Sequence, residues 1–173
     1  MEVHVEMEQL DTTGLAEKYD EWISFIAKTH HGSNPRRNDP VPFARPAKPL
    51  SQCGVALLTT AGAHLDDQEP FHVETVAGDP THRIIPDDAD LWRVRFTHTH
   101  YDTSSAELDT NVVLPIDRLL ELVERGRVGS SSPIHIGMMG FNPNPDPIAD
   151  QLGPTVAGLL SEMEVDIALL VPG

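Results

Sequence analysis

The sequence predicts an α/β fold, with a mostly parallel sheet and flanking helices arranged in three layers. Two observations carry this prediction. Through the later half of the chain, apolar runs of strand length alternate with amphipathic runs of helix length, which is the order of βαβ units. The runs at residues 55–60, 134–139 and 165–171 are almost continuously apolar, as expected of parallel strands that are buried on both faces.

Two helices are expected between these strands. The first covers residues 115–125, where Pro115 suits the first helical position and a glycine, Gly126 or Gly129, can end the helix. One face of this helix is apolar, formed by Ile116, Leu119, Leu120 and Val123. The second helix should begin at Asp146-Pro147 and be kinked or broken at Gly153-Pro154, because proline lacks a backbone donor.

Residues 91–97 are a further strand candidate. Trp92, Val94 and Phe96 alternate with two arginines, so the three apolar residues are expected to face the core, and the arginines indicate a sheet edge or a solvated face. Residues 63–90 contain no clear periodicity and are rich in Asp, His, Gly and Pro. A connection of that length is often functional.

Residues 1–50 are expected to precede the α/β domain of residues 51–173. Residues 14–30 predict a helix, and its apolar face comprises Leu15, Tyr19, Trp22, Ile23 and Ile26. Residues 32–50 contain five prolines, which exclude a regular helix or a central strand and predict a tether on the surface.

Composition limits which partners the protein is expected to bind and in which cellular compartment it is expected. The chain has 27 acidic and 12 basic residues, a formal charge of −15, which repels phosphate backbones and argues against nucleic-acid binding. No apolar run approaches the ~18 residues of a membrane span, and the acidic N-terminus does not resemble a signal peptide. The single cysteine, Cys53, fits a reducing, cytoplasmic location and is expected to be an inert buried thiol at the amino end of the sheet.

Ligands of open α/β sheets bind at the carboxyl ends of the strands. Four segments should meet there: residues 59–62, 98–103, 140–142 and 172–173. In the first, Thr59, Thr60 and Gly62 form a small polar turn that could contact a substrate.

His98 and His100 are two residues apart, so an extended backbone places both on one face, close to Asp102. Such a group could perform acid–base catalysis or ligate a divalent metal. The structural alternative is that one histidine is packed and the other exposed. His64 could join the pair across the crevice, whereas His135, within a strand, is expected to be a hydrogen-bonded core residue.

Four longer stretches of the sequence resemble a known protein family: residues 55–65, 78–86, 97–103 and 109–119. They resemble the selenoprotein B family of the glycine, sarcosine, betaine and D-proline reductases, and the resemblance covers about residues 50–173. It implies reductive C–N bond cleavage in a small amino-acid-like substrate. Tyr101 and Thr103 join the polar turn and His64 as candidate substrate-binding residues, with His98, His100 and Asp102 as candidate catalytic residues.

The resemblance also implies a selenocysteine or cysteine just after the last strand, and here the sequence departs from the pattern. It stops at Pro172-Gly173, with neither residue following. The expectation is either truncation at a selenocysteine codon or a short paralogue without the redox centre. Two other functions stay open, a metal-dependent enzyme using His98, His100 and Asp102, and a non-catalytic binding module. Expected partners are a small-molecule substrate and either other reductase subunits or further copies of the chain.

Overall fold

The computed structural model describes residue 24, residues 44–75 and residues 77–173. Except for Ser24, the helix expected over residues 14–30 lies outside this part of the chain, as does most of the proline-rich tether. Residues 44–49 form no regular element, and a 3₁₀ turn, η1 (Leu50–Gln52), leads into the first strand. Within the described residues, no helix is long and apolar enough to cross a membrane.

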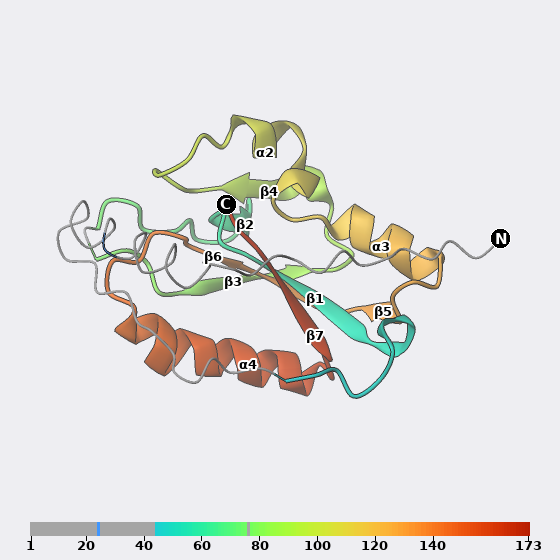
Figure 1. Ribbon diagram of the computed structural model, residues 1–173. Coiled ribbons are helices and arrows are strands. Elements are labelled where there is room, and N and C mark those ends of the chain that lie inside the picture. The colour runs from blue at the N-terminus through green and yellow to red at the C-terminus, as the bar shows by residue number, and fades with distance from the viewer. Residues whose placement is uncertain (1–23, 25–43, 76) are drawn as a thin grey trace.

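A mostly parallel sheet forms the centre of the described chain (Figure 1). Its strands are β1 (Gly54–Thr59), β3 (His82–Pro86), β5 (Ser130–Ser131), β6 (Ile134–Met138) and β7 (Ile167–Val171). β1 pairs in parallel with β5, β6 and β7, and β3 pairs antiparallel with β6. Leu58 pairs with both Ile136 and Leu170, so β6 and β7 lie on opposite sides of β1. The predicted α/β class with a mostly parallel sheet is therefore confirmed.

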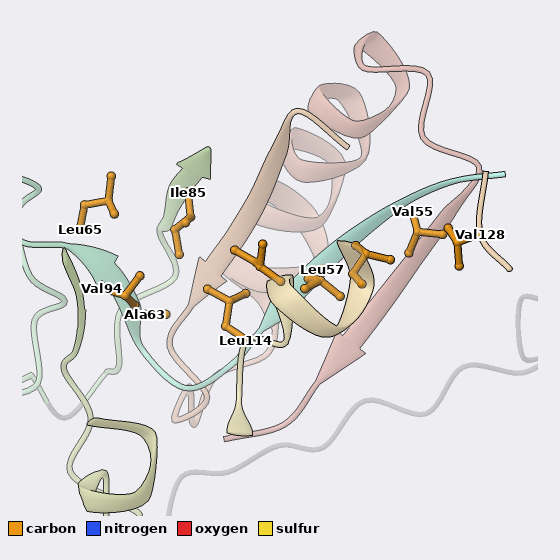
Figure 2. Close-up of a cluster of buried hydrophobic side chains, with 10 residues drawn as sticks. Val55, Leu57, Ala63, Leu65, Ile85, Val94, Leu114 and Val128 are labelled. Atoms are coloured by element: carbon orange, nitrogen blue, oxygen red, sulfur yellow. The ribbon is translucent and has the colours of Figure 1, made fainter. Parts of the chain in front are cut away.

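Alternate residues of β1 point to the two faces of the sheet. Ala56 and Leu58 pack with Ile136 and with helix α4 (Gly153–Glu162) on one face. Val55 and Leu57 face the other side, toward helix α3 (Ile116–Glu124), as Figure 2 shows for the strand residues. Burying each of the larger side chains contributes about 1.5–3 kcal/mol. The layer on the α3 side of the sheet also contains residues of two short strands, because these residues belong to the same hydrophobic cluster as Val55 and Leu57.

Those two strands account for the first correction to the sequence prediction. Leu91–Arg93 forms a 3₁₀ turn, η2, and only Val94–Phe96 is a strand, β4, which pairs antiparallel with β2 (Ala63–Leu65) outside the main sheet. Val94 is buried, but Trp92 is 71% exposed, so its predicted place in the core is wrong. The physical reason is that β2 offers only three residues for pairing, and the chain before Val94 turns instead of extending.

The connection over residues 63–90 contains β2 and β3, which the sequence reading missed. β3 runs antiparallel to β6, and its Ile85 is fully buried in the core.

The last strand has the predicted location, but its predicted burial is wrong. Leu169 is 49% exposed and Leu170 is 66% exposed. β7 pairs with β1 along one edge, and within the described residues no strand pairs with the other edge. Neither leucine belongs to the clusters beneath α3 and α4.

The helix predictions hold with shifted boundaries. α3 ends at Glu124, and Gly126, with φ +65°, donates its N–H to the Val123 carbonyl, as a glycine beyond a helix end does. The second helix begins with a π-helical turn, η4 (Ile148–Leu152), and becomes α4 at Gly153, so an irregularity is present where Gly153-Pro154 predicted one. Two short elements, α2 (Ser104–Leu108) and η3 (Thr110–Val112), precede α3.

Candidate functional site

The carboxyl ends of β1, β6 and β7 meet around Thr60. The Thr60 backbone N–H donates to the Val171 carbonyl (3.1 Å), and the Gly173 N–H donates to Thr60 Oγ1 (3.1 Å). Ala61 forms an isolated antiparallel bridge with Met139, at the end of β6. The segments at residues 59–62 and 172–173 are thus hydrogen-bonded to each other, and the first is bridged to Met139, the residue directly before the segment at 140–142.

The fourth segment, residues 98–103, reaches the same place from β4. Tyr101 donates its hydroxyl hydrogen to the Ala61 carbonyl (3.1 Å), which ties the segment to the turn after β1. A Cβ added to Gly140 would lie 3.0 Å from the Thr60 carbonyl oxygen and 3.1 Å from His98 Nε2. His98 Nε2, the Thr60 carbonyl and Gly140 are therefore packed close together at the strand ends.

His98 has a defined tautomer. Its Nδ1 accepts the backbone N–H of His100 (3.0 Å), so in the neutral ring the proton resides on Nε2. Partial burial, and to a lesser extent the charge of His100, hold the pKa of His98 below its usual 6.5. The ring also contacts Tyr101 edge-on, with 4.8 Å between centroids. At neutral pH, His98 consequently presents a hydrogen-bond donor beside Thr60 and Gly140.

His100 is oriented differently. Its ring stacks on Phe141, with 3.7 Å between centroids and 12° between planes, and its Nδ1 lies 3.1 Å from Thr99 Oγ1. The two imidazoles are nearly perpendicular, with centroids 5.9 Å apart. The His100–Phe141 stack links the 98–103 segment to the end of β6. Phe141 lies in one of the four segments predicted to converge but is not among the predicted site residues, although an aromatic residue directly after a strand is the signal that could have pointed to it.

Asp102 and Thr103 contact the start of α2. Asp102 Oδ1 accepts the Ser104 N–H (3.0 Å), and this hydrogen bond lowers the pKa of the Asp102 carboxyl. The Thr103 hydroxyl donates to Glu107 Oε1 (2.8 Å). The first is the geometry of an Asx turn before the helix, and the second joins two side chains four residues apart, whereas the N-cap residue itself, Thr103, makes no side-chain cap hydrogen bond. Their roles in catalysis and substrate binding stay predictions.

The backbone N–H groups of the polar turn after β1 are hydrogen-bonded within the protein. Thr59 is fully buried, and its Oγ1 accepts the Ala61 N–H (3.2 Å). The Gly62 N–H donates to the Met138 carbonyl (2.9 Å). Gly62 has φ +70°, and a Cβ there would lie 2.1 Å from the Thr97 carbonyl oxygen, so this position requires glycine. Of the turn residues predicted to bind substrate, Thr60 is the one that packs close to Gly140 and His98 Nε2.

His64 is an internal residue of β2. It is 4% exposed; Nδ1 lies 2.8 Å from the Leu65 carbonyl oxygen and must donate to it, so Nε2 accepts the Thr97 hydroxyl hydrogen (2.8 Å). Both ring nitrogens are thus engaged within the protein. His64 supports Thr97, the residue immediately before His98, and its predicted contact with substrate stays untested.

The geometry does not assemble His98, His100 and Asp102 as metal ligands. Among the described residues, no three His, Cys, Asp or Glu side chains are placed to hold one ion. His98 Nδ1 accepts a backbone N–H, so His98 would have to give up that hydrogen bond to ligate a metal.

A Ser–His–Asp constellation lies elsewhere, around β6. His135 is fully buried, accepts the Leu57 N–H at Nδ1 (3.1 Å) and donates from Nε2 to Asp87 Oδ1 (2.9 Å). Ser131 Oγ also donates to Asp87 Oδ1 (2.6 Å). Because His135 Nε2 carries a proton, it cannot remove one from Ser131, so the group is structural. The expectation of a hydrogen-bonded core histidine is confirmed.

Cys53 is fully buried just before β1, and its thiol lies 3.4 Å from the carbonyl oxygens of Lys48 and Pro49. Its predicted burial at the amino end of the sheet is confirmed. Two hollows, of about 600 and 670 Å³, lie away from His98. One is lined by Trp92 and Leu108, and the other surrounds Gly54 and Asp166. Converging polar groups, and not a hollow, therefore define the candidate site around Thr60 and His98.

A family model described as glycine/sarcosine/betaine reductase selenoprotein B matches residues 32–172. The chain is also similar to the D-proline reductase subunit gamma of Acetoanaerobium sticklandii, with 35% identity over 126 residues, which is 73% of this chain and 51% of that protein. The chain thus spans about half the length of this curated relative. No solved structure matches it. With a family model covering most of the sequence and a relative of this similarity, the chain belongs to the glycine/sarcosine/betaine reductase selenoprotein B family.

Proposed function

We propose that this chain forms the substrate-binding part of a reductase that cleaves a C–N bond in a small amino acid of the D-proline type. The name of the similar subunit supports the substrate class. The observation that carries the proposal is the meeting of His98 Nε2, Thr60 and Gly140 beside the terminal Gly173. This is the edge of a parallel sheet at which small ligands bind.

Reductive cleavage of one C–N bond consumes two electrons and two protons, and it yields one C–H and one N–H bond. Cys53 cannot deliver the electrons to the proposed site, because it is fully buried at the opposite end of β1. The redox group must come from outside the described residues. In the family pattern it is a selenocysteine or cysteine that directly follows the strand corresponding to β7. A residue attached to Gly173 would begin next to Thr60, which already binds the Gly173 N–H.

His98 is proposed to act as a hydrogen-bond donor to an anionic group. Its lowered pKa keeps the ring neutral at pH 7, and the proton on Nε2 is then available to a substrate carboxylate or to an ionised thiol or selenol. Thr60 fixes the strand ends, and Tyr101 holds the 98–103 segment against Ala61. The other reductase subunits and a cytoplasmic location remain part of the proposal.

Calorimetric titration with D-proline tests the binding role. The chain should bind D-proline, and His98→Ala should weaken binding by about tenfold or more, the effect of losing a hydrogen bond to a charged group. Arg118→Ala is the matched control, because Arg118 lies on the outer face of α3 and pairs with Glu121. Equal D-proline affinity in both variants would contradict the assignment of His98.

A non-catalytic binding module is the second candidate, and the remote position of Cys53 favours it. A chain carrying a cysteine appended after Gly173 separates the two. With a dithiol donor, ring opening of D-proline supports the reductase. Binding of D-proline with no turnover by the appended chain supports the binding module.

A further inference from the structure

His64 is a buried histidine in a strand whose neighbouring residues are apolar. Ala63 and Leu65, on either side of it, belong to the hydrophobic cluster beneath α3 (Figure 2), so His64 points to the opposite face of β2. Burying an imidazole is unfavourable unless its ring nitrogens are hydrogen-bonded. The partners of the His64 ring therefore indicate what a histidine does at this position.

The contacts of the His64 ring fix its tautomer and its orientation. Nδ1 lies 2.8 Å from the Leu65 carbonyl oxygen, which can only accept, so Nδ1 carries the proton. Nε2 is then an acceptor, and the Thr97 hydroxyl donates to it (2.8 Å). The ring also meets the buried Phe71 ring at 68°, with 6.3 Å between centroids. The Arg83 guanidinium lies over the Phe71 ring, 4.4 Å from its centroid, and supports it in turn.

Thr97 is held at three points. Its N–H donates to the Gly62 carbonyl (3.0 Å), and its hydroxyl donates to His64. Its carbonyl oxygen lies so close to Gly62 that a Cβ there would be 2.1 Å away. Threonine is branched at Cβ, so fixing its hydroxyl also restricts χ1 and the adjoining backbone. His98 is the next residue, and the hydrogen bond from the His100 N–H to His98 Nδ1 closes the turn that begins there.

We propose that His64 is a positioning residue, which acts through the Thr97 hydroxyl to hold the turn that places His98 Nε2 beside Gly140. This role differs from the predicted contact with substrate, because both ring nitrogens of His64 are engaged within the protein. The consequence for D-proline binding rests on the proposed function. The hold on the turn does not, and it can be measured without substrate.

Hydrogen exchange of the His100 amide in the full chain measures how firmly the turn is held. This N–H donates to His98 Nδ1, and an amide in a turn exchanges when the turn opens locally, without global unfolding. Thr97→Val keeps the shape of the side chain and removes its hydroxyl. The His100 amide should then exchange about 2- to 12-fold faster, the factor that corresponds to one hydrogen bond. Thr97→Ser keeps a hydroxyl and should exchange at nearly the rate of the parent chain.

Two substitutions of His64 separate its two hydrogen bonds. In His64→Gln the amide oxygen can take the place of Nε2 and accept the Thr97 hydroxyl, whereas the shorter side chain of His64→Asn can replace only Nδ1. His64→Asn should therefore accelerate exchange of the His100 amide as Thr97→Val does, and His64→Gln should restore much of the protection. Combining His64→Asn with Thr97→Val should add nothing further, because both remove the same interaction.

Leu65→Ala is the matched control, because it removes packing from the same strand and leaves both hydrogen bonds of His64 in place. Equal exchange of the His100 amide in Thr97→Val and the parent chain would overturn the proposal. So would the same acceleration in Leu65→Ala, because the turn would then follow the stability of the whole chain.

Calorimetry with D-proline gives the second readout. Thr97→Val should weaken binding and Thr97→Ser should restore it. Unchanged affinity in Thr97→Val, in a chain that binds D-proline, would overturn the positioning role. If the parent chain does not bind D-proline, the proposed function fails, and the exchange rates alone decide whether His64 holds the turn.

Discussion

Replacing Gly140 by alanine tests whether His98 Nε2 is the hydrogen-bond donor of the proposed site. The added Cβ would lie 3.1 Å from Nε2 and 3.0 Å from the Thr60 carbonyl oxygen. Both distances are shorter than ordinary van der Waals contact, so the methyl group would crowd Nε2 and compete with any ligand that accepts its proton. The variant therefore perturbs the site without removing any of its polar groups.

The size of the effect follows from what is lost. A hydrogen bond to a charged group is worth about 1.5–3 kcal/mol, so blocking it should weaken D-proline binding by about 10- to 150-fold. Crowding by one methyl group should cost about 1–3 kcal/mol of folding free energy, because Thr60 and His98 must shift by a few tenths of an ångström. The binding loss should therefore be measurable in a chain that is still folded.

Calorimetry with D-proline measures the affinity, and urea unfolding measures the stability. Gly158→Ala is the matched control, because a Cβ at Gly158 in α4 would meet nothing within 4 Å. That variant should gain about 0.5–1 kcal/mol of stability and bind D-proline normally. If Gly140→Ala is folded and binds D-proline as tightly as the parent chain, Nε2 is not the donor.

Three further variants or conditions extend the test. Gly62→Ala should lose about 2–5 kcal/mol of unfolding free energy by urea denaturation, because alanine must adopt φ +70° against the Thr97 carbonyl; a loss below about 1 kcal/mol would contradict the close approach. Burial lowers the pKa of His135 in the folded chain, so the contribution of its neutral ring to the free energy of unfolding should be fully present above pH 6.5. That free energy should fall as the pH drops toward the folded-state pKa, by at most about 1.4 kcal/mol per pH unit for each proton taken up. A urea midpoint that does not fall between pH 7 and pH 5 would count against the buried neutral ring. Asp102→Ala should lower the thermal unfolding midpoint through loss of the hydrogen bond to the Ser104 N–H, whereas Asp102→Asn should keep the midpoint close to that of the parent chain; equal midpoints for Asp102→Ala and the parent chain would contradict a stabilising role for this bond.

Elements with strong local signals could be predicted from the sequence. The helix around Ile116 and the strand that contains His135 could be predicted because their signals depend only on neighbouring residues. These signals are the spacing of apolar residues and the glycines or prolines that mark the ends of an element. The convergence at Thr60 followed from a general rule, that the carboxyl ends of parallel strands share one edge.

The errors came from features that depend on distant partners. Trp92 alternates correctly for a strand, but β2 is too short to pair with it, and β2 carries almost no signal of its own. Leu169 and Leu170 have the composition of a buried strand, and whether such a strand is buried depends on what lies beside it. The tautomer of His98 depends on a backbone hydrogen bond within its own turn, and no spacing rule reveals it.

The central claim is that His98 presents a proton to an anionic group near the end of β7. Its most direct test is the thiol pKa of a cysteine appended directly after Gly173, followed by a short Gly-Ser tail and measured by the pH dependence of alkylation. Cys53 is buried and should react slowly in comparison. The account predicts a thiol pKa below the unperturbed ~8.5, restored toward that value by His98→Ala. A thiol pKa at or above ~8.5 that His98→Ala does not change would contradict it.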